Sequence, residues 1–376
     1  MLVSRICTLK NAELVLSLPP ITGIMVALPI EFGITGTPMT LFLILIPGYL
    51  LITIYLANRN QAVGHTFDSM DNQLVRWLLY AAGWLSLMMG LFLVMASILA
   101  DRLIEEGEAI YPVSSASVVA GVLLTWASSL LIFRFVGLPA WREQLRGLIG
   151  GMRSYNPQSI VHITAVVFSV LVFTGVIVLF WADGGSAAAA ESASDISVDG
   201  ILLQNALFIV AAVLGVGLQI RRDWSTVIQR LGLRVPTAAD IRWGVGFGLG
   251  LFLLLVVISL VLVALFGDLN EEAATRQVEA LIAPPLPLML LMLVLIAIGE
   301  EVFFRGALQP VFGNLPVSLF FAIMHTQTLF SPLILVLIVV SLGLGWLRDH
   351  HSTTAAIIAH FCYNLIQLLI QMAAGT

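Results

Sequence analysis

Three charged side chains interrupt a stretch that is otherwise apolar, GEEVFFRG at residues 299–306. On an α-helix, Glu301 and Arg305 lie on one face, where they can neutralise each other. Glu300 is turned about 100° away from Glu301. A charged side chain at mid-membrane costs on the order of 2.5–3.5 kcal/mol on insertion scales. We therefore expect the trio to face protein rather than lipid.

Two further polar motifs recur downstream at the spacing of one helical turn. FAIMH separates Phe321 and His325 by one turn, and HFCYN does the same for His360 and Asn364. Each motif is expected on a helix of its own. Ionisable residues inside a membrane mark functional sites by default, so these segments together indicate a site that carries a carboxylate, two imidazoles and an amide.

These residue types suit the addition of water to a carbonyl. A buried Glu300 can act as a general base, and His325 can position a water or shuttle a proton. His360 with Asn364 can donate hydrogen bonds to a developing oxyanion. Alternatively, Glu300, His325 and His360 could hold a divalent metal such as zinc and leave one position open for water. Both routes predict hydrolysis of an amide, and the residues alone leave the choice between them open.

The ordered motifs Glu-Glu-x-x-x-Arg, Phe-x-x-x-His and His-x-x-x-Asn resemble those of the CAAX-protease and bacteriocin-processing family, also called CPBP or Abi. Its members are intramembrane endopeptidases and include the enzyme that removes the last three residues of prenylated proteins. The resemblance covers about Arg221–Thr376. It implies an integral membrane protease whose substrate is a membrane-associated protein or peptide, prenylated or not. The family is often described as metalloproteases, although a metal-free glutamate mechanism fits the same residues.

The resemblance implies a role for each of six side chains. Glu300 would be the base that activates water, Glu301 and Arg305 its support, His325 a partner to the same water, and His360 and Asn364 the groups that stabilise the oxyanion or complete the site. In the metal alternative, Glu300, His325 and His360 would be the ligands.

Functions from other classes compete with this interpretation. A Glu–Arg pair by itself could be structural, and Glu300 with the histidines could form the proton relay of a secondary transporter. Broken helices in both halves would favour a transporter, but the polar residues gather in the carboxy-terminal half. A catalytically silent scaffold or immunity protein of the same fold is the remaining alternative.

Composition identifies the elements that must position these residues. Of 376 residues, 59% are hydrophobic and 10% are charged, against about 25% charged in soluble proteins. Runs of about ten alternating residues, typical of barrels, do not occur. We predict an all-α, polytopic bundle of about ten spans. Its uncharged runs are Met39–Ala57, Trp77–Ala100, Val113–Phe133, Ile160–Ala182, Ile201–Ile220 and Trp243–Gly267, followed by helices at Pro287–Val311, Pro316–Thr328, Pro332–Arg348 and Ser352–Met372.

Loop charges predict the orientation. The loops Arg134–Ser159 and Arg221–Arg242 hold four and five arginines, whereas Asp183–Gly200 between them has four acidic residues and no basic one. Basic loops stay cytoplasmic, so the charged trio falls in the cytoplasmic half of the membrane. Sixteen arginines against one lysine indicate a GC-rich prokaryotic genome and hence a prokaryotic plasma membrane.

The Gly/Ser/Ala-rich stretch 183–199 predicts a boundary between an amino-terminal helical region, 1–200, with no assigned role and a protease core, 201–376. Leu14–Ile30 is interpreted as a first, broken span, and 268–283 as an external amphipathic helix. Trp224, Val227, Ile228 and Leu231 have the spacing of an interfacial helix, unless their loop merely fixes topology.

Other sequence features exclude further partners. GVGFGLG at residues 244–250 has no strand before it, which argues against nucleotide binding. Its glycine pairs four apart fit close helix packing instead. Cys7 and Cys362 form no metal motif and are not expected to form a disulfide. We expect membrane lipid as a partner, and neither nucleotide nor nucleic acid.

Overall fold

The computed structural model describes residues 37–106, 112–148, 154–182, 184–185, 198–267, 284–325 and 331–374, with side chains from residue 45 onward. The expected span at Leu14–Ile30 and the expected helix at 268–283 lie outside these ranges, as does most of the loop predicted at Asp183–Gly200.

The described residues form helices, with no strand among them beyond one isolated bridge between Leu218 and Arg222. The all-α prediction is thereby confirmed. In chain order the elements are α2 (Thr37–Ala62), η1 (Met70–Asn72), α3 (Gln73–Glu105), α4 (Ser115–Gly137), α5 (Pro139–Leu148), α6 (Ile160–Ala182), α8 (Val198–Val216), α9 (Trp224–Arg230), α10 (Ala238–Phe266), α12 (Leu286–Glu300), η3 (Glu301–Leu308), α13 (Gln309–Phe312), α14 (Asn314–Ile323), α15 (Ile334–His350) and α16 (Thr353–Ala374).

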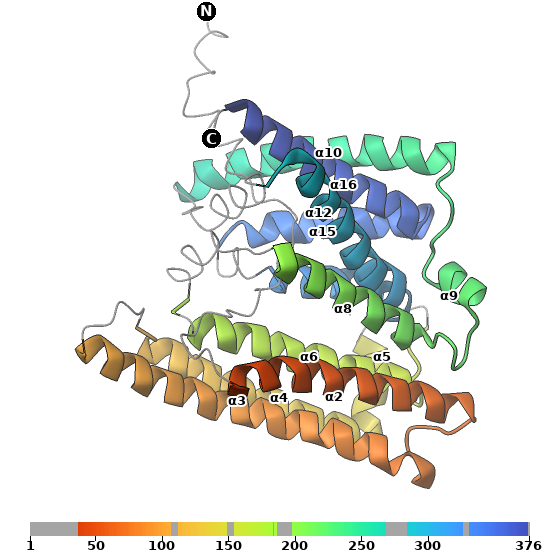
Figure 1. Cartoon of the computed structure of the whole chain (residues 1–376). Coiled ribbons are helices and arrows are strands. Elements are labelled where there is room, and N and C mark those ends of the chain that lie inside the picture. Colours follow the sequence, from red (N-terminus) through yellow and green to blue (C-terminus); the bar gives the residue numbers. More distant parts are fainter. Residues whose placement is uncertain are drawn as a thin grey trace, which may run out of the picture.

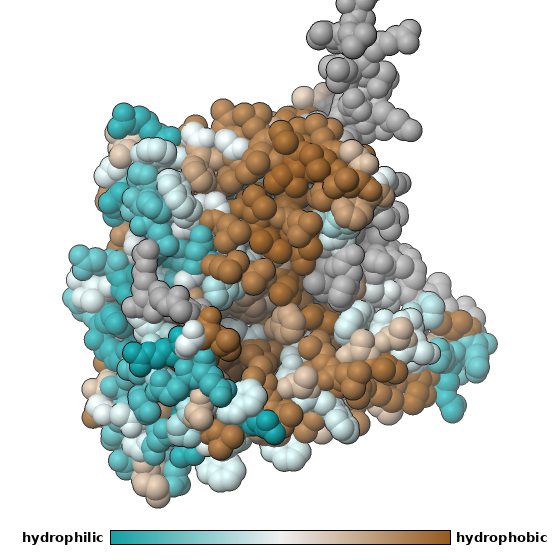
Figure 2. All heavy atoms as spheres, turned by 180° about the vertical axis from the view of Figure 1, so that it is seen from behind, coloured by the Kyte–Doolittle hydropathy of each residue, from teal (hydrophilic) through white to brown (hydrophobic). Residues whose placement is uncertain are grey.

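Seven helical stretches in the described ranges are long and apolar enough to cross a membrane. Side chains such as Trp84, Trp126 and Leu253, which a soluble protein would bury, are more than half exposed on them. Figure 2 shows the resulting broad apolar surface, with hydrophilic residues gathered along the left edge and in a smaller group at the lower right. The chain is an integral, multi-pass membrane protein, and the predicted count of ten spans is approximate.

The expected helix at Pro316–Thr328 differs in the structure. Helix α14 ends at Ile323 and has ten residues, which is about 15 Å of helix and half of a hydrocarbon core about 30 Å thick. The sequence predicts His325 inside this helix. In the structure it lies just beyond the helix end.

The helices form two groups that meet at α8 (Figure 1). Helices α3, α4 and α6 pack on one another, with α2 against α6. On the other side, α16 packs against α10, α12 and α15. Helix α8 contacts both α2 and α12. It belongs to the region from residue 201 onward that we assigned to the protease core, and the domain boundary itself stays a prediction.

The loops predicted to be cytoplasmic lie at one end of the bundle. Ser159 donates to Gln61 at 2.8 Å, and the Arg221 Nε donates to Asn58 at 2.7 Å, so both basic loops meet at the end of α2. At the same end Thr353 N donates to Gly232 O at 3.1 Å. Helix α9 lies there too (Figure 1). The alternation of loops predicted from their charges is consistent with this arrangement.

The interfacial interpretation of α9 needs correction. Val227 and Leu231 are fully buried against Ala212, Val216 and Val302, while Trp224 is exposed. The apolar face of α9 thus docks on α8 and η3 rather than on lipid.

The glycine pairs of α10 separate into two classes. A Cβ at Gly248 would lie 2.6 Å from the backbone oxygen of Ala359, and one at Gly244 would lie 2.6 Å from Ile358. At Gly246 and Gly250 a Cβ would meet nothing within 4 Å. Close packing of α10 on α16 therefore depends on the first pair only. Since Ala359 precedes His360, this packing also sets the position of that histidine.

We predict that Gly248→Ala lowers the free energy of unfolding by about 1–3 kcal/mol, because the methyl group must push α16 away. Gly250→Ala, on the same helix but facing open space, is the matched control and should change it by less than about 0.5 kcal/mol. Denaturant unfolding in detergent micelles measures both. Equal effects of the two substitutions would contradict the packing described here.

Candidate active site

The segment that carries the charged trio is not a continuous α-helix. Helix α12 ends at Glu300, and Glu301–Leu308 follows as a π-helical segment, η3. At its end Gln309 N donates to Phe304 O, five residues earlier. The sequence predicted an α-helix over Pro287–Val311 and did not foresee this change. Short π-segments inside α-helices occur frequently at functional sites, and here the change falls between the two glutamates.

Glu301 and Arg305 form the predicted ion pair inside the protein. The Arg305 Nε lies 3.2 Å from the Glu301 Oε2, and neither side chain is more than 1% exposed. Arg305 also donates to the hydroxyl of Ser341 on α15 at 2.9 Å, and its guanidinium stacks over the Phe321 ring at 4.5 Å. One arginine thereby ties η3 to α14 and α15. Ser341 was not among the residues predicted from sequence.

His360 on α16 lies between the two glutamates. Its Nδ1 is 2.9 Å from the Glu301 Oε1, and its Nε2 is 3.9 Å from the Glu300 Oε2. All three side chains are buried, with exposed fractions of 1% or less. A carboxylate can only accept, so Nδ1 carries a proton and donates it to Glu301. Glu301 therefore binds Arg305 through one oxygen and His360 through the other.

His325 is held by the backbone of its own segment. Its Nδ1 lies 2.7 Å from Phe321 O, and because a carbonyl only accepts, Nδ1 is the donor. In the neutral imidazole, Nε2 is then a proton acceptor. The ring packs on Phe321 with centroids 4.4 Å apart, and the centroid of His360 is 6.5 Å from the same phenyl ring.

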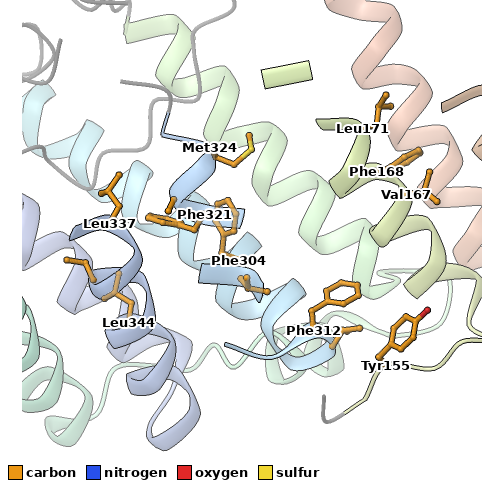
Figure 3. Close-up of a cluster of buried hydrophobic side chains, with 14 of the residues drawn as sticks. Tyr155, Val167, Phe168, Leu171, Phe304, Phe312, Phe321, Met324, Leu337 and Leu344 are labelled. Carbon is orange, nitrogen blue, oxygen red and sulfur yellow. The ribbon is translucent and has the colours of Figure 1, made fainter. Parts of the chain in front are cut away.

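Phe321 thus contacts side chains from three motifs. Figure 3 shows it beside Phe304 within the buried apolar cluster, and the two rings meet edge to face at 5.1 Å. The contacts of Phe321 with Arg305, His325 and His360 make it the apolar centre of the candidate site.

Asn364 stands one turn beyond His360 on α16 and is completely buried. Among the described residues neither its amide nitrogen nor its amide oxygen has a hydrogen-bond partner. A buried polar group in that state costs about 1–3 kcal/mol, and such groups in native proteins call for a specific explanation. A substrate group that binds the Asn364 amide would be such an explanation.

The metal alternative can be tested against the geometry. Within the described ranges, no three or more His, Cys, Asp and Glu side chains are grouped closely enough to hold a metal ion. The Nδ1 atoms of both His325 and His360 are engaged by protein acceptors, an arrangement that histidines bound to a metal through Nε2 also show. A zinc ion held by Glu300, His325 and His360 stays a prediction.

A further buried amide borders the site. Asn205 of α8 is 2% exposed and donates to Ile201 O at 2.9 Å. Its side chain lies against the Cα of Gly299, where any Cβ would collide with it. The sequence carried a signal for this residue, an amide beside Gln204 inside the uncharged run Ile201–Ile220, that we did not use.

Comparison with protein families bears on the carboxy-terminal part of the chain. Residues 282–366 match the family described as type II CAAX prenyl endopeptidase Rce1-like. No curated protein and no solved structure was found to match the chain. The matched segment contains all three motifs, and it supports a CAAX-type intramembrane endopeptidase as the general class of activity. The match supports the CAAX-protease family that the motifs predicted for this part of the chain.

Proposed function

We propose that the protein hydrolyses a peptide bond near the cytoplasmic face of the membrane, with Glu300 as the base and without a metal. The observation that carries this proposal is the buried contact of His360 with both glutamates, one turn from the Asn364 amide. The substrate is a membrane-associated protein or peptide, and its prenylation is the finer expectation that the family suggests.

The proposed reaction begins with a water between Glu300 and His325. Glu300 takes a proton from this water while the water oxygen attacks the carbonyl carbon of the scissile bond. The carbonyl oxygen becomes an oxyanion, to which the amide nitrogen of Asn364 donates a hydrogen bond. Glu300 then gives the proton to the leaving nitrogen as the carbon–nitrogen bond breaks. The products are a carboxylate and an amine.

Glu301, Arg305 and His360 act in this scheme as positioning residues. Glu301 is neutralised by Arg305 and therefore does not compete with Glu300 as a base. Glu301 also orients His360, whose Nε2 faces the carboxylate of Glu300. His325 keeps Nε2 as an acceptor because Phe321 O fixes its Nδ1 proton. In this scheme His325 contacts the water, and His360 positions the Glu300 carboxylate.

We predict that Glu300→Gln lowers the rate of peptide cleavage by about 10²–10⁴, because a neutral amide cannot accept the proton of water. The fold should persist, since the side chain keeps its size. Quantitative proteomics of membrane fractions would reveal uncleaved substrate in the variant. Glu143→Gln, on the exposed surface of α5, is the control and should leave cleavage unchanged.

Full activity of Glu300→Gln would refute the proposal. Proton-dependent uptake by proteoliposomes without any peptide cleavage would instead favour the transporter alternative.

We predict opposite effects of Asn364→Ala on activity and on stability. Cleavage should fall by about 10²–10³, as for the loss of one oxyanion donor. Unfolding in denaturant should show unchanged or higher stability, because a buried amide without hydrogen bonds is removed. Asn58→Ala is the contrast. The amide of Asn58 donates to Ile54 O and Leu214 O and accepts from Arg221, so its removal should destabilise the protein. Loss of stability in Asn364→Ala would contradict the assigned role.

Chelation tests the metal-free part of the proposal. We predict that dialysis of the purified enzyme against a strong chelator leaves the cleavage rate within about twofold, because no three or more His, Cys, Asp and Glu side chains in the described ranges are grouped closely enough to hold a metal ion. The measurement is cleavage before and after dialysis, with zinc added back. Inhibition that zinc alone reverses would establish the metal alternative with Glu300, His325 and His360.

A further inference from the structure

A tight turn at the cytoplasmic end of α8 presents two adjacent arginines, Arg221 and Arg222. The turn starts at Gly217, with φ +93°, and passes through Gln219, which has φ +57° without being a glycine. The amide nitrogens of both arginines donate back to Gly217 O at 2.9 and 3.0 Å. Left-handed backbone at a residue other than glycine costs free energy and persists where the surroundings impose it, often at ligand sites.

A third arginine, Arg230 at the end of α9, completes the group. Each guanidinium is anchored by one nitrogen to a neutral acceptor: Arg221 Nε to Asn58 Oδ1 at 2.7 Å, Arg222 Nη1 to Val216 O, and Arg230 Nη1 to Gly306 O at 3.0 Å. All three side chains are half-buried. The other guanidinium nitrogens remain available for an acceptor from outside the protein, since a guanidinium has five donors.

The three arginines have no counter-charge in the described part of the chain, where no carboxylate lies within 4 Å of any of them. The nearby acidic groups are engaged elsewhere. Asp223 accepts from Thr226 N and from the Ser225 hydroxyl, and Asp349 pairs with Arg348 at 3.1 Å. Arg142, Arg234, Arg305 and Arg348, by contrast, each pair with a carboxylate.

Repulsion among the guanidinium groups contributes to a lowered pKa of Arg221 and of Arg230. Burial, and after it the charges of Arg222 and Arg230, lowers the pKa of Arg221 to about 10. Burial, followed by Arg222 and Arg348, lowers the pKa of Arg230 to about 10. The groups stay charged at neutral pH. Half-buried like charges without a counter-ion are unfavourable, so the arrangement calls for an anionic ligand.

We propose that Arg221, Arg222 and Arg230 form a binding site for the phosphate of an anionic phospholipid in the cytoplasmic leaflet. The site lies at the ends of α2 and α8, which is the depth of the headgroups if the basic loops are cytoplasmic. These two helices pack together, and each exposes apolar side chains along its length, among them Tyr55 of α2 and Val210 of α8. An acyl chain can lie on this surface while the phosphate binds the guanidinium groups.

The proposal does not depend on the peptidase activity. The arginine site connects the two groups of helices, because Arg221 binds Asn58 of α2 and Arg230 binds Gly306 of η3. A lipid bound at this point would stabilise the junction between the amino-terminal helices and the segment that holds the glutamates.

Short-chain phosphatidylglycerol, titrated into the detergent-solubilised protein, tests the site. The thermal unfolding midpoint should rise with lipid concentration, and phosphatidylcholine of the same chain length should leave it unchanged. Arg222→Gln and Arg230→Gln should each weaken the apparent affinity by about tenfold. Arg222→Lys should retain most of it, since the charge remains. Arg146→Gln, on exposed α5 at the same end, is the matched control and should respond like the wild type.

Misfolding can be told apart from loss of the site. Without lipid, Arg222→Gln and Arg230→Gln should melt no lower than the wild type, because one of three repelling charges is gone. A full lipid response in the double variant would overturn the proposal, as would an equal loss in Arg146→Gln. Inorganic phosphate that reproduces the shift at equal concentration would also overturn it and indicate a site for a soluble anion.

Discussion

The ion pair of Glu301 with Arg305 is the interaction on which the carboxy-terminal half depends. Both side chains are buried in an apolar bundle, where a single uncompensated charge would be very costly. Arg305 spreads its charge over Ser341 and the face of Phe321, and Glu301 uses its second oxygen for His360. Helices α14, α15 and α16 are thereby fixed to η3 by one connected set of polar contacts.

Much of this arrangement could be predicted because polar residues are so rare in the chain. Glu300, Glu301, Arg305, His325, His360 and Asn364 stand out against a background with 10% charged residues, and their one-turn spacing places them on shared faces. The helices follow from uncharged runs long enough to cross a bilayer, and Ile160–Ala182 agrees with α6 residue for residue. In a membrane both kinds of signal come from the same constraint, the cost of polar groups in lipid.

What could not be predicted depends on contacts between segments far apart in the chain. The π-helical turn at Glu301–Leu308 has no local signal, because its residues would also form an α-helix. Ser341 and Asn205 are polar residues whose role appears only when α15 lies beside η3 and α8 lies beside Gly299. The interfacial prediction for α9 was wrong for the same reason. An apolar helix face has the same sequence pattern whether it contacts lipid or protein, and here it contacts α8 and η3.

The short helix α14 has a consequence for geometry. It starts beside α15, where Asn314 donates to Leu342 O at 2.9 Å, and it ends two residues before His325. Its length, about 15 Å of helix, therefore sets how far that histidine lies from the end of the bundle where α14 begins. One inserted residue would lower the histidine by about 1.5 Å and swing it by about 100°. The ten residues of α14 thus act as a spacer whose length is tied to both the height and the direction of the imidazole.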